Sequence, residues 1–185
     1  MSDNFSFIFC QIKNHIILLT QCKDNTKIRN TKICRQKVMK YFTIKELTHS
    51  DTATARGISN VPDANAVVHL TELIVRLLDP LREAWGNPIK VTSGYRGFRL
   101  NSAVGGSKSS AHCYGYAADI VPVGESITDF KAFVLDWLKT SRVKYDQYID
   151  EASGASQWVH LAIRNGQGEQ RKQRLKMRGG KYYAI

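Results

Sequence analysis

The chain has 185 residues, 43% of them hydrophobic, which fits one globular domain with a sizeable core rather than two. The formal net charge is +11, but the charge is not evenly distributed. Residues 1–38 contain seven basic and two acidic residues, and residues 164–185 contain seven basic residues and one acidic residue. The net charge of residues 39–163 is therefore zero. A neutral body argues against an enzyme of nucleic acids, which carries positive charge around its site, whereas basic ends suit an anionic surface or are simply solvated tails.

Residues 1–38 differ from the rest of the chain because polar, basic and apolar residues alternate there without a period. The stretch from Phe5 to Thr20 is interrupted by polar residues and lacks a cleavage site, so it is a poor signal peptide and a poor transmembrane span. We expect residues 1–38 to be a poorly ordered extension, either upstream sequence before a true start at Met39 or a basic anchor, and residues 39–185 to be the domain. We also expect the protein to be made in the cytosol without an export signal of its own.

Two helical segments are predicted in the first half of the domain. Thr43 and Glu46 form the pattern of a capping box at a short helix, and residues 47–60 follow as a polar loop. From Pro62 to Trp85, apolar residues recur at helical spacing, which predicts a long amphipathic helix. Pro80 should kink or split that helix near Leu78, because proline lacks a backbone N–H.

The second half alternates short strands with loops. Strands are predicted at 88–92, 117–121, 145–150 and 157–163, with a turn at 151–156, a short helix at 99–104, a capped helix from Ser126 and a basic tail at 164–183. The sum is an α+β fold in which a small antiparallel sheet has helices packed on one side. No disulfide framework or cysteine metal site is predicted, because the four cysteines lack paired spacing.

Three residues of this half could ligate a metal ion. Asp119 and His160 each lie within an apolar strand, where a charge is costly unless it is paired or bound to metal, and His112 precedes Asp119 by seven residues. Two imidazoles and a carboxylate suit zinc and leave one position open for water, as a catalytic site requires. Each residue also has a commoner structural explanation, since a histidine in a strand is usually part of the core and an aspartate can pair with arginine.

Four motifs occur in a fixed order: S-G-Y-R at 93–96, L-N-x-x-V-G-G at 100–106, S-x-H-x-x-G-x-A-x-D at 110–119 and W-V-H at 158–160. Over roughly residues 39–184 the chain resembles the zinc D-Ala-D-Ala carboxypeptidase family, which includes vancomycin-resistance D,D-dipeptidases and phage L-alanyl-D-glutamate endolysins. It is most similar to the small phage and prophage branch. The resemblance implies that His112, Asp119 and His160 bind zinc and that Arg96 and Ser110 line the substrate site.

The motifs do not identify the general base. The family often has an acidic residue three positions before the last histidine, but this chain has Gln157 there, and an amide cannot act as a base. If residues 145–151 alternate as a strand, Glu151 shares one face with Gln147 and Asp150 lies on the other. We predict Glu151 as the base, with Asp150 as the alternative. Arg96 is expected to hold a substrate carboxylate, or else to form a structural ion pair.

The function predicted from these residues is a monomeric zinc metallopeptidase that hydrolyses peptidoglycan stem peptides, as a carboxypeptidase or an endopeptidase. On this reading the protein acts on the cell wall and has no nucleic-acid partner, and a phage or prophage product, such as an endolysin, is favoured over a bacterial one. Gln157 supports an alternative, a non-catalytic cell-wall binding module that retains the fold.

Overall fold

The computed structural model describes residues 6–12, 15–21 and 38–185 of the chain, which divides into two units, Met1–Val38 and Met39–Ile185. In the first unit, β1 (Ser6–Ile12) and β2 (His15–Gln21) pair as an antiparallel hairpin that the sequence analysis did not anticipate. The expected poor order of residues 1–38 falls largely outside the described residues and stays a prediction.

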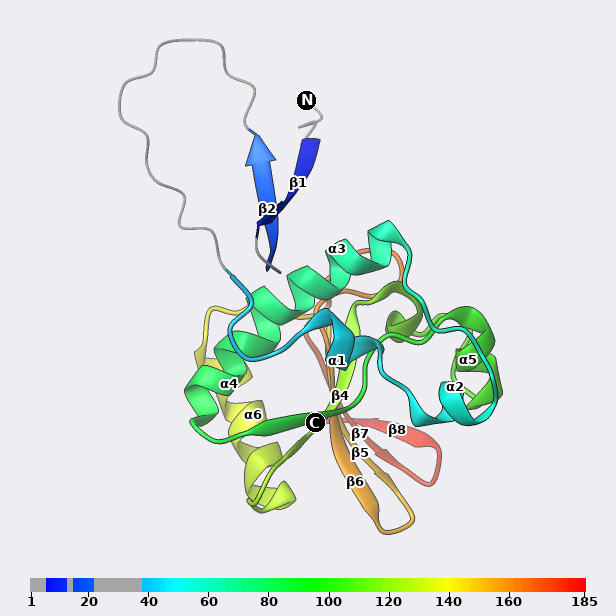
Figure 1. The fold of residues 1–185 in the computed structure, drawn as a ribbon. Coiled ribbons are helices and arrows are strands. Elements are labelled where there is room, and N and C mark those ends of the chain that lie inside the picture. The colour runs from blue at the N-terminus through cyan, green and yellow to red at the C-terminus, as the bar shows by residue number, and fades with distance from the viewer. Residues whose placement is uncertain (1–5, 13–14, 22–37) are drawn as a thin grey trace. The chain divides into compact units, whose positions relative to one another are not determined.

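A six-stranded sheet is the centre of the second unit (Figure 1). Its spatial order is β3-β4-β6-β5-β7-β8, and every pairing is antiparallel except that of β5 with β7. The strands are β3 (Ile89–Ser93), β4 (Ala117–Pro122), β5 (Gln147–Ser153), β6 (Ser156–Ala162), β7 (Gln173–Arg178) and β8 (Lys181–Ala184). Together with the helices, this mostly antiparallel sheet confirms the predicted α+β class.

Helices begin where the sequence supplies caps. The Thr43 and Ser126 hydroxyls accept hydrogen bonds from the backbone N–H groups of Glu46 and Asp129, as the capping patterns predict. The helical elements are α1 (Ile44–Thr48), α2 (Asp51–Ala55), α3 (Ala64–Leu73), η1 (Ile74–Leu78), α4 (Asp79–Trp85), α5 (Phe98–Ala103), η2 (Ala111–Tyr114) and α6 (Ile127–Thr140). No helix in the described part of the chain is both long and apolar enough to cross a membrane.

The long predicted helix is interrupted at the position that Pro80 indicates. The stretch η1 is a π-helical turn, in which the N–H of Asp79 donates to the carbonyl of Ile74, five residues back. Pro80 follows in the first turn of α4 and has no N–H to donate, so the extra residue of the π turn lies just before the proline.

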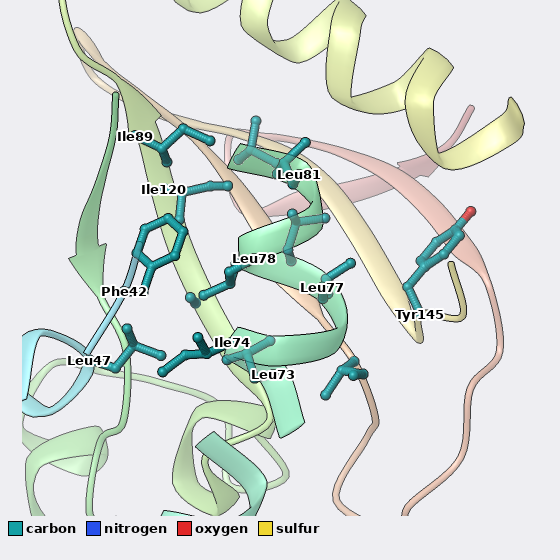
Figure 2. Close-up of a cluster of buried hydrophobic side chains, with 14 of the residues drawn as sticks. Phe42, Leu47, Leu73, Ile74, Leu77, Leu78, Leu81, Ile89, Ile120 and Tyr145 are labelled. Carbon is teal, nitrogen blue, oxygen red and sulfur yellow. The ribbon is translucent and has the colours of Figure 1, made fainter. Parts of the chain in front are cut away.

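One face of the sheet packs against α3, η1, α4 and α6, and this contact forms the hydrophobic core. Figure 2 shows residues of α3, η1 and α4 gathered beside Ile89 and Ile120 of the sheet. Each fully buried side chain of this size contributes about 1.5–3 kcal/mol relative to an exposed one. The buried members of this layer include Leu70, Leu73, Ile74, Leu77, Leu78, Leu81, Ile120, Phe130, Val134, Val159 and Leu161.

The opposite face of the sheet carries the predicted site. Asp119 pairs with His160 across β4 and β6, and His160 pairs with Ile149 across β6 and β5, so these side chains share one face. Their neighbours Ile120, Val159 and Leu161 alternate to the helical face and belong to the core.

Three expectations need correction. The 47–60 loop contains α2, and the turn between β5 and β6 is shorter than 151–156, because β5 continues to Ser153 and includes Glu151. The predicted tail joins the sheet as β7 and β8, with β7 parallel to β5. An ion pair between Arg178 of β7 and Asp150 of β5, with Oδ2 2.9 Å from Nη2, links these two strands. The composition of β7 is too basic for the strand to be recognised from the sequence.

Candidate metal centre

His112, Asp119 and His160 come together on the sheet face, as predicted from the sequence. His112 lies in η2, Asp119 in β4 and His160 in β6, and all three are buried. His160 Nδ1 is 2.9 Å from Asp119 Oδ1 and 3.1 Å from His112 Nε2, and His112 Nε2 is 3.2 Å from Asp119 Oδ1. The ligands of a tetrahedral zinc ion are separated by roughly 3.3 Å, so the three atoms are spaced as a common ion requires.

The proton positions at this cluster favour a cation. Nδ1 of His112 is 2.7 Å from the carbonyl oxygen of Gly94, which can only accept, so Nδ1 carries the proton and Nε2 of the neutral ring has a free lone pair. Asp119 Oδ1 also presents lone pairs, and His160 Nδ1 can direct one proton at most toward the centre. At the contact between His112 Nε2 and Asp119 Oδ1, a lone pair therefore faces another lone pair, which is repulsive. A metal ion placed among the three ligand atoms would accept these lone pairs.

Burial and charge keep these groups in the forms that ligate metal. Burial lowers the pKa of the His112 imidazole, which favours its neutral form. Burial alone would raise the pKa of the Asp119 carboxyl, but the hydrogen bond with His160 opposes this effect, and the net result is a pKa well below the usual range. The carboxylate is therefore ionised at neutral pH.

Two glycines of the motifs allow the backbone to present His112. A Cβ on Gly94 would lie 2.1 Å from the carbonyl oxygen of Leu47, so no side chain fits where the Gly94 carbonyl orients the His112 ring. Gly115 ends η2 with a φ of 77°, a left-handed conformation that glycine adopts without strain, and a Cβ there would lie 2.7 Å from the carbonyl oxygen of Ala66.

The cluster opens into a cavity of about 600 Å³, and all the other predicted site residues line it. Arg96, Ser110 and Glu151 are among its lining residues, together with Ile149 and Trp158 of the same sheet face. A cavity of this size suits a small molecule or a short peptide segment.

Arg96 is placed between the metal cluster and the cavity. Its Nη1 is 3.6 Å from Asp119 Oδ2 and donates to Ser93 Oγ at 3.1 Å. Its Nε is buried and has no hydrogen-bond partner among the described residues. Arg96 thus makes a structural contact with Asp119 and also lines the cavity, so the two sequence interpretations of this residue are compatible.

The two candidates for a general base, and Gln157 at the family's usual position for it, have separate surroundings. Glu151 lines the cavity, and burial raises the pKa of its carboxyl above the ordinary value. Asp150 lies on the other face and is paired with Lys131, with Oδ1 2.6 Å from Nζ, and with Arg178. Gln157 accepts a hydrogen bond of 2.9 Å from Lys131 Nζ and does not line the cavity, because positions 157 and 160 of a strand face opposite sides.

Sequence reasoning missed part of the cavity wall. Tyr182 of β8 and Arg171 both line the cavity, and both belong to the segment that was interpreted as a tail. Asp146 is 1% exposed and accepts bonds of 2.7 Å from both Nε and Nη2 of Arg171. A signal was present in the isolated acid Asp146 before an apolar strand, since a carboxylate next to a core run usually needs a cationic partner.

Fold and site together define a protein with a buried His-Asp-His cluster that could hold a metal ion on the open face of an α+β sheet, with donors that suit zinc. The chain belongs to the Peptidase M15 family, whose sequence profile matches residues 40–162. Over 82 residues it is 38% identical to the zinc D-Ala-D-Ala carboxypeptidase of Streptomyces albus G, a match that covers 43% of this chain and 30% of that relative. The family resemblance inferred from the motifs is therefore confirmed, although the matched segment is under a third of the relative's length.

Proposed function

We propose that the protein is a zinc peptidase that hydrolyses a peptide bond in the stem peptides of peptidoglycan. The observation that carries this proposal is the convergence of His112 Nε2, Asp119 Oδ1 and His160 Nδ1 at the floor of an open cavity that Glu151 and Arg96 also line. The family membership supports the peptidase activity, and the name of the Streptomyces relative supports zinc and a peptide with D-Ala residues.

Glu151 is the proposed general base. Zinc bound by the three residues would supply a Lewis acid that polarises the scissile carbonyl and lowers the pKa of a bound water. Glu151 would take the proton of the attacking water on its carboxylate and deliver it to the leaving amine, a cycle that an amide cannot perform. The placement of Glu151 on the same sheet face as His160 supports this role, whereas Asp150 is occupied by two cations on the other face.

Arg96 and Ser110 are the proposed substrate contacts. Arg96 lines the cavity with a side chain that is 20% exposed, and this suits a substrate carboxylate, which guanidinium binds with two parallel hydrogen bonds. In a stem peptide this group is the C-terminal carboxylate of D-Ala or the α-carboxylate of D-Glu. These two choices correspond to a carboxypeptidase and to an L-alanyl-D-glutamate endopeptidase. Ser110 at the cavity wall would hydrogen-bond the peptide backbone.

The alternative function is a cell-wall binding module without catalysis. It depended on Gln157, but the side chain of Gln157 is hydrogen-bonded to Lys131 away from the cavity, while Glu151 supplies a carboxylate on the metal face. A phage or prophage origin, a monomeric state and action on the cell wall remain part of the proposal.

Digestion of purified peptidoglycan tests the function and identifies the bond. Zinc-loaded protein should release either free D-Ala or new L-Ala and D-Glu termini, which mass analysis of the products distinguishes. The Glu151→Gln variant is the matched control, because it keeps the three ligands. Binding of zinc and of peptidoglycan without any product would favour the non-catalytic module.

A further inference from the structure

A second cavity, of about 370 Å³, lies apart from the metal centre and is surrounded by positive charge. We call it the basic cavity; its cationic lining residues are Lys139, Arg142, Lys144, Lys172 and Arg174, and the others are Leu138, Ser141, Val143 and Tyr145. Within the described ranges, no acidic residue lines it and none of the five cations takes part in an ion pair. Five unpaired like charges around one hollow repel one another, so an anion there would stabilise the arrangement.

The helix dipole explains only one of these cations. Lys139 lies in the last turn of α6, where a positive charge is favourable. Arg142 and Lys144 follow the helix in the chain segment that leads to β5, and Lys172 and Arg174 come from the segment at the start of β7. Two separate parts of the chain therefore contribute cations to the same hollow.

The backbone at Lys172 is fixed by its neighbours. Arg171 N donates to Asp146 Oδ1 at 3.1 Å, and Gln173 N donates to the Asp146 carbonyl at 2.8 Å. Between these two contacts Lys172 has a φ of 57°, a left-handed conformation that is unfavourable for a lysine. The same short segment places Arg171 in the metal-centre cavity and Lys172 in the basic cavity.

A free hydrogen-bonding group adds to the charge. The Oγ atom of Ser141 is buried and has no hydrogen-bond partner among the described residues. A buried hydroxyl without a partner is costly, and an acceptor oxygen of a bound anion would satisfy it.

We propose that the basic cavity binds phosphodiester groups of an anionic wall polymer built from polyol phosphate repeats. Five cationic side chains are more than are needed to bind a single carboxylate. A polymer with one phosphate in each repeat would present several closely spaced negative charges to these side chains. The lining offers no exposed aromatic ring on which a base could stack, since Tyr145 is 4% exposed, and this disfavours single-stranded nucleic acid. The choice of a wall polymer rests on the proposed function, which places the protein at the cell wall.

Neighbouring residues connect this cavity with the metal centre. Tyr145, Lys172 and Arg174 line the basic cavity, whereas the adjacent Asp146, Arg171 and Leu175 line the metal-centre cavity. The two cavities share no lining residue, so a polymer in one leaves the other open to a peptide.

Direct binding of a fluorescent glycerol phosphate oligomer to the full zinc-bound chain tests the proposal. The Arg142→Gln/Lys144→Gln variant should bind it roughly tenfold more weakly, with a shallower dependence of affinity on salt. The Lys45→Gln/Lys90→Gln variant loses the same charge at exposed positions outside the cavity and should stay within about twofold of the wild type. Equal thermal midpoints of the three proteins would show that the weaker binding is not caused by a loss of folding.

Three outcomes would overturn the proposal. They are no binding of the oligomer, an equal loss in both variants, or tighter binding of a single-stranded oligonucleotide or of polyglutamate with the same number of charges. Hydrolysis of a soluble stem peptide is measured in parallel and should be unchanged in both variants, because neither changes a residue of the metal-centre cavity. Binding without hydrolysis in the wild type would contradict the peptidase function and leave the basic cavity as proposed.

Discussion

At the scale of single residues, the side on which a strand residue points decides its role. Glu151 lines the metal-centre cavity and Gln157 contacts Lys131 on the other side, although the two lie on paired strands. Glu151→Gln should slow peptide hydrolysis by roughly 10²–10⁴-fold while zinc content stays unchanged, because it removes a proton acceptor and no ligand. Gln157→Glu is the control and should leave the rate near that of the wild type. Full activity of Glu151→Gln would rule out this base.

The carbonyl of Gly94 acts on the metal centre through His112. Gly94→Ala should weaken zinc binding by roughly 10–100-fold and lower the thermal midpoint, because a Cβ 2.1 Å from the Leu47 carbonyl oxygen forces the backbone that orients the His112 ring to move. Gly97→Ala, at the position directly after this motif, places a Cβ whose nearest atoms are at 3.7 Å, and it should behave like the wild type. Zinc titration with a competing chelator measures the zinc affinity of both variants. Equal zinc affinities of the Gly94→Ala and Gly97→Ala variants would contradict the positioning role of Gly94.

At the scale of elements, Asp150 links β5 to α6 and β7 through Lys131 and Arg178. Burial raises the pKa of this carboxyl, but the hydrogen bonds from Lys131 and Arg178 outweigh it, so the pKa in the folded state is below the ordinary 3.8. The stability from this group is therefore complete above about pH 4 and is lost as the pH falls toward the folded-state pKa.

Thermal midpoints between pH 7 and pH 3 should fall less steeply for Asp150→Asn, from a lower starting value, than for the wild type. Asp136→Asn, at an exposed position of α6, should follow the wild-type slope. Identical slopes for all three proteins would contradict the linkage.

The sequence predicts those elements whose pattern is local. Caps at Thr43 and Ser126, the interruption before Pro80 and the strands that carry Asp119 and His160 follow from side-chain chemistry and periodicity. Strands β7 and β8 were not predicted, because five of their ten residues are polar or basic and because they join the sheet only through the pairing of β7 with β5, which is distant in the chain. For the same reason Tyr182 and Arg171 were absent from the predicted site. Glu151 was assigned to a turn because the predicted strand ended at 150, whereas β5 pairs with β6 as far as Ser153.

At the scale of the whole molecule, the core cluster of described residues lies within 39–163, and the chain divides at Val38. A shortened chain that begins at Met39 should therefore keep its thermal midpoint within a few degrees and its zinc affinity. Calorimetry of both chains measures this. A large loss of stability after removal of residues 1–38 would show that the segment is integral to the domain.

The central claim is that one zinc ion held by His112, Asp119 and His160 is needed for hydrolysis of the stem peptide. The most direct test adds zinc stepwise to metal-free protein and records the products released from peptidoglycan at each step. Activity should rise from the baseline and level off at about one zinc per chain, and His160→Ala should neither retain zinc at this ratio nor recover activity. Full activity in the metal-free protein, or one tightly bound zinc per chain with no product at any step, would contradict the account.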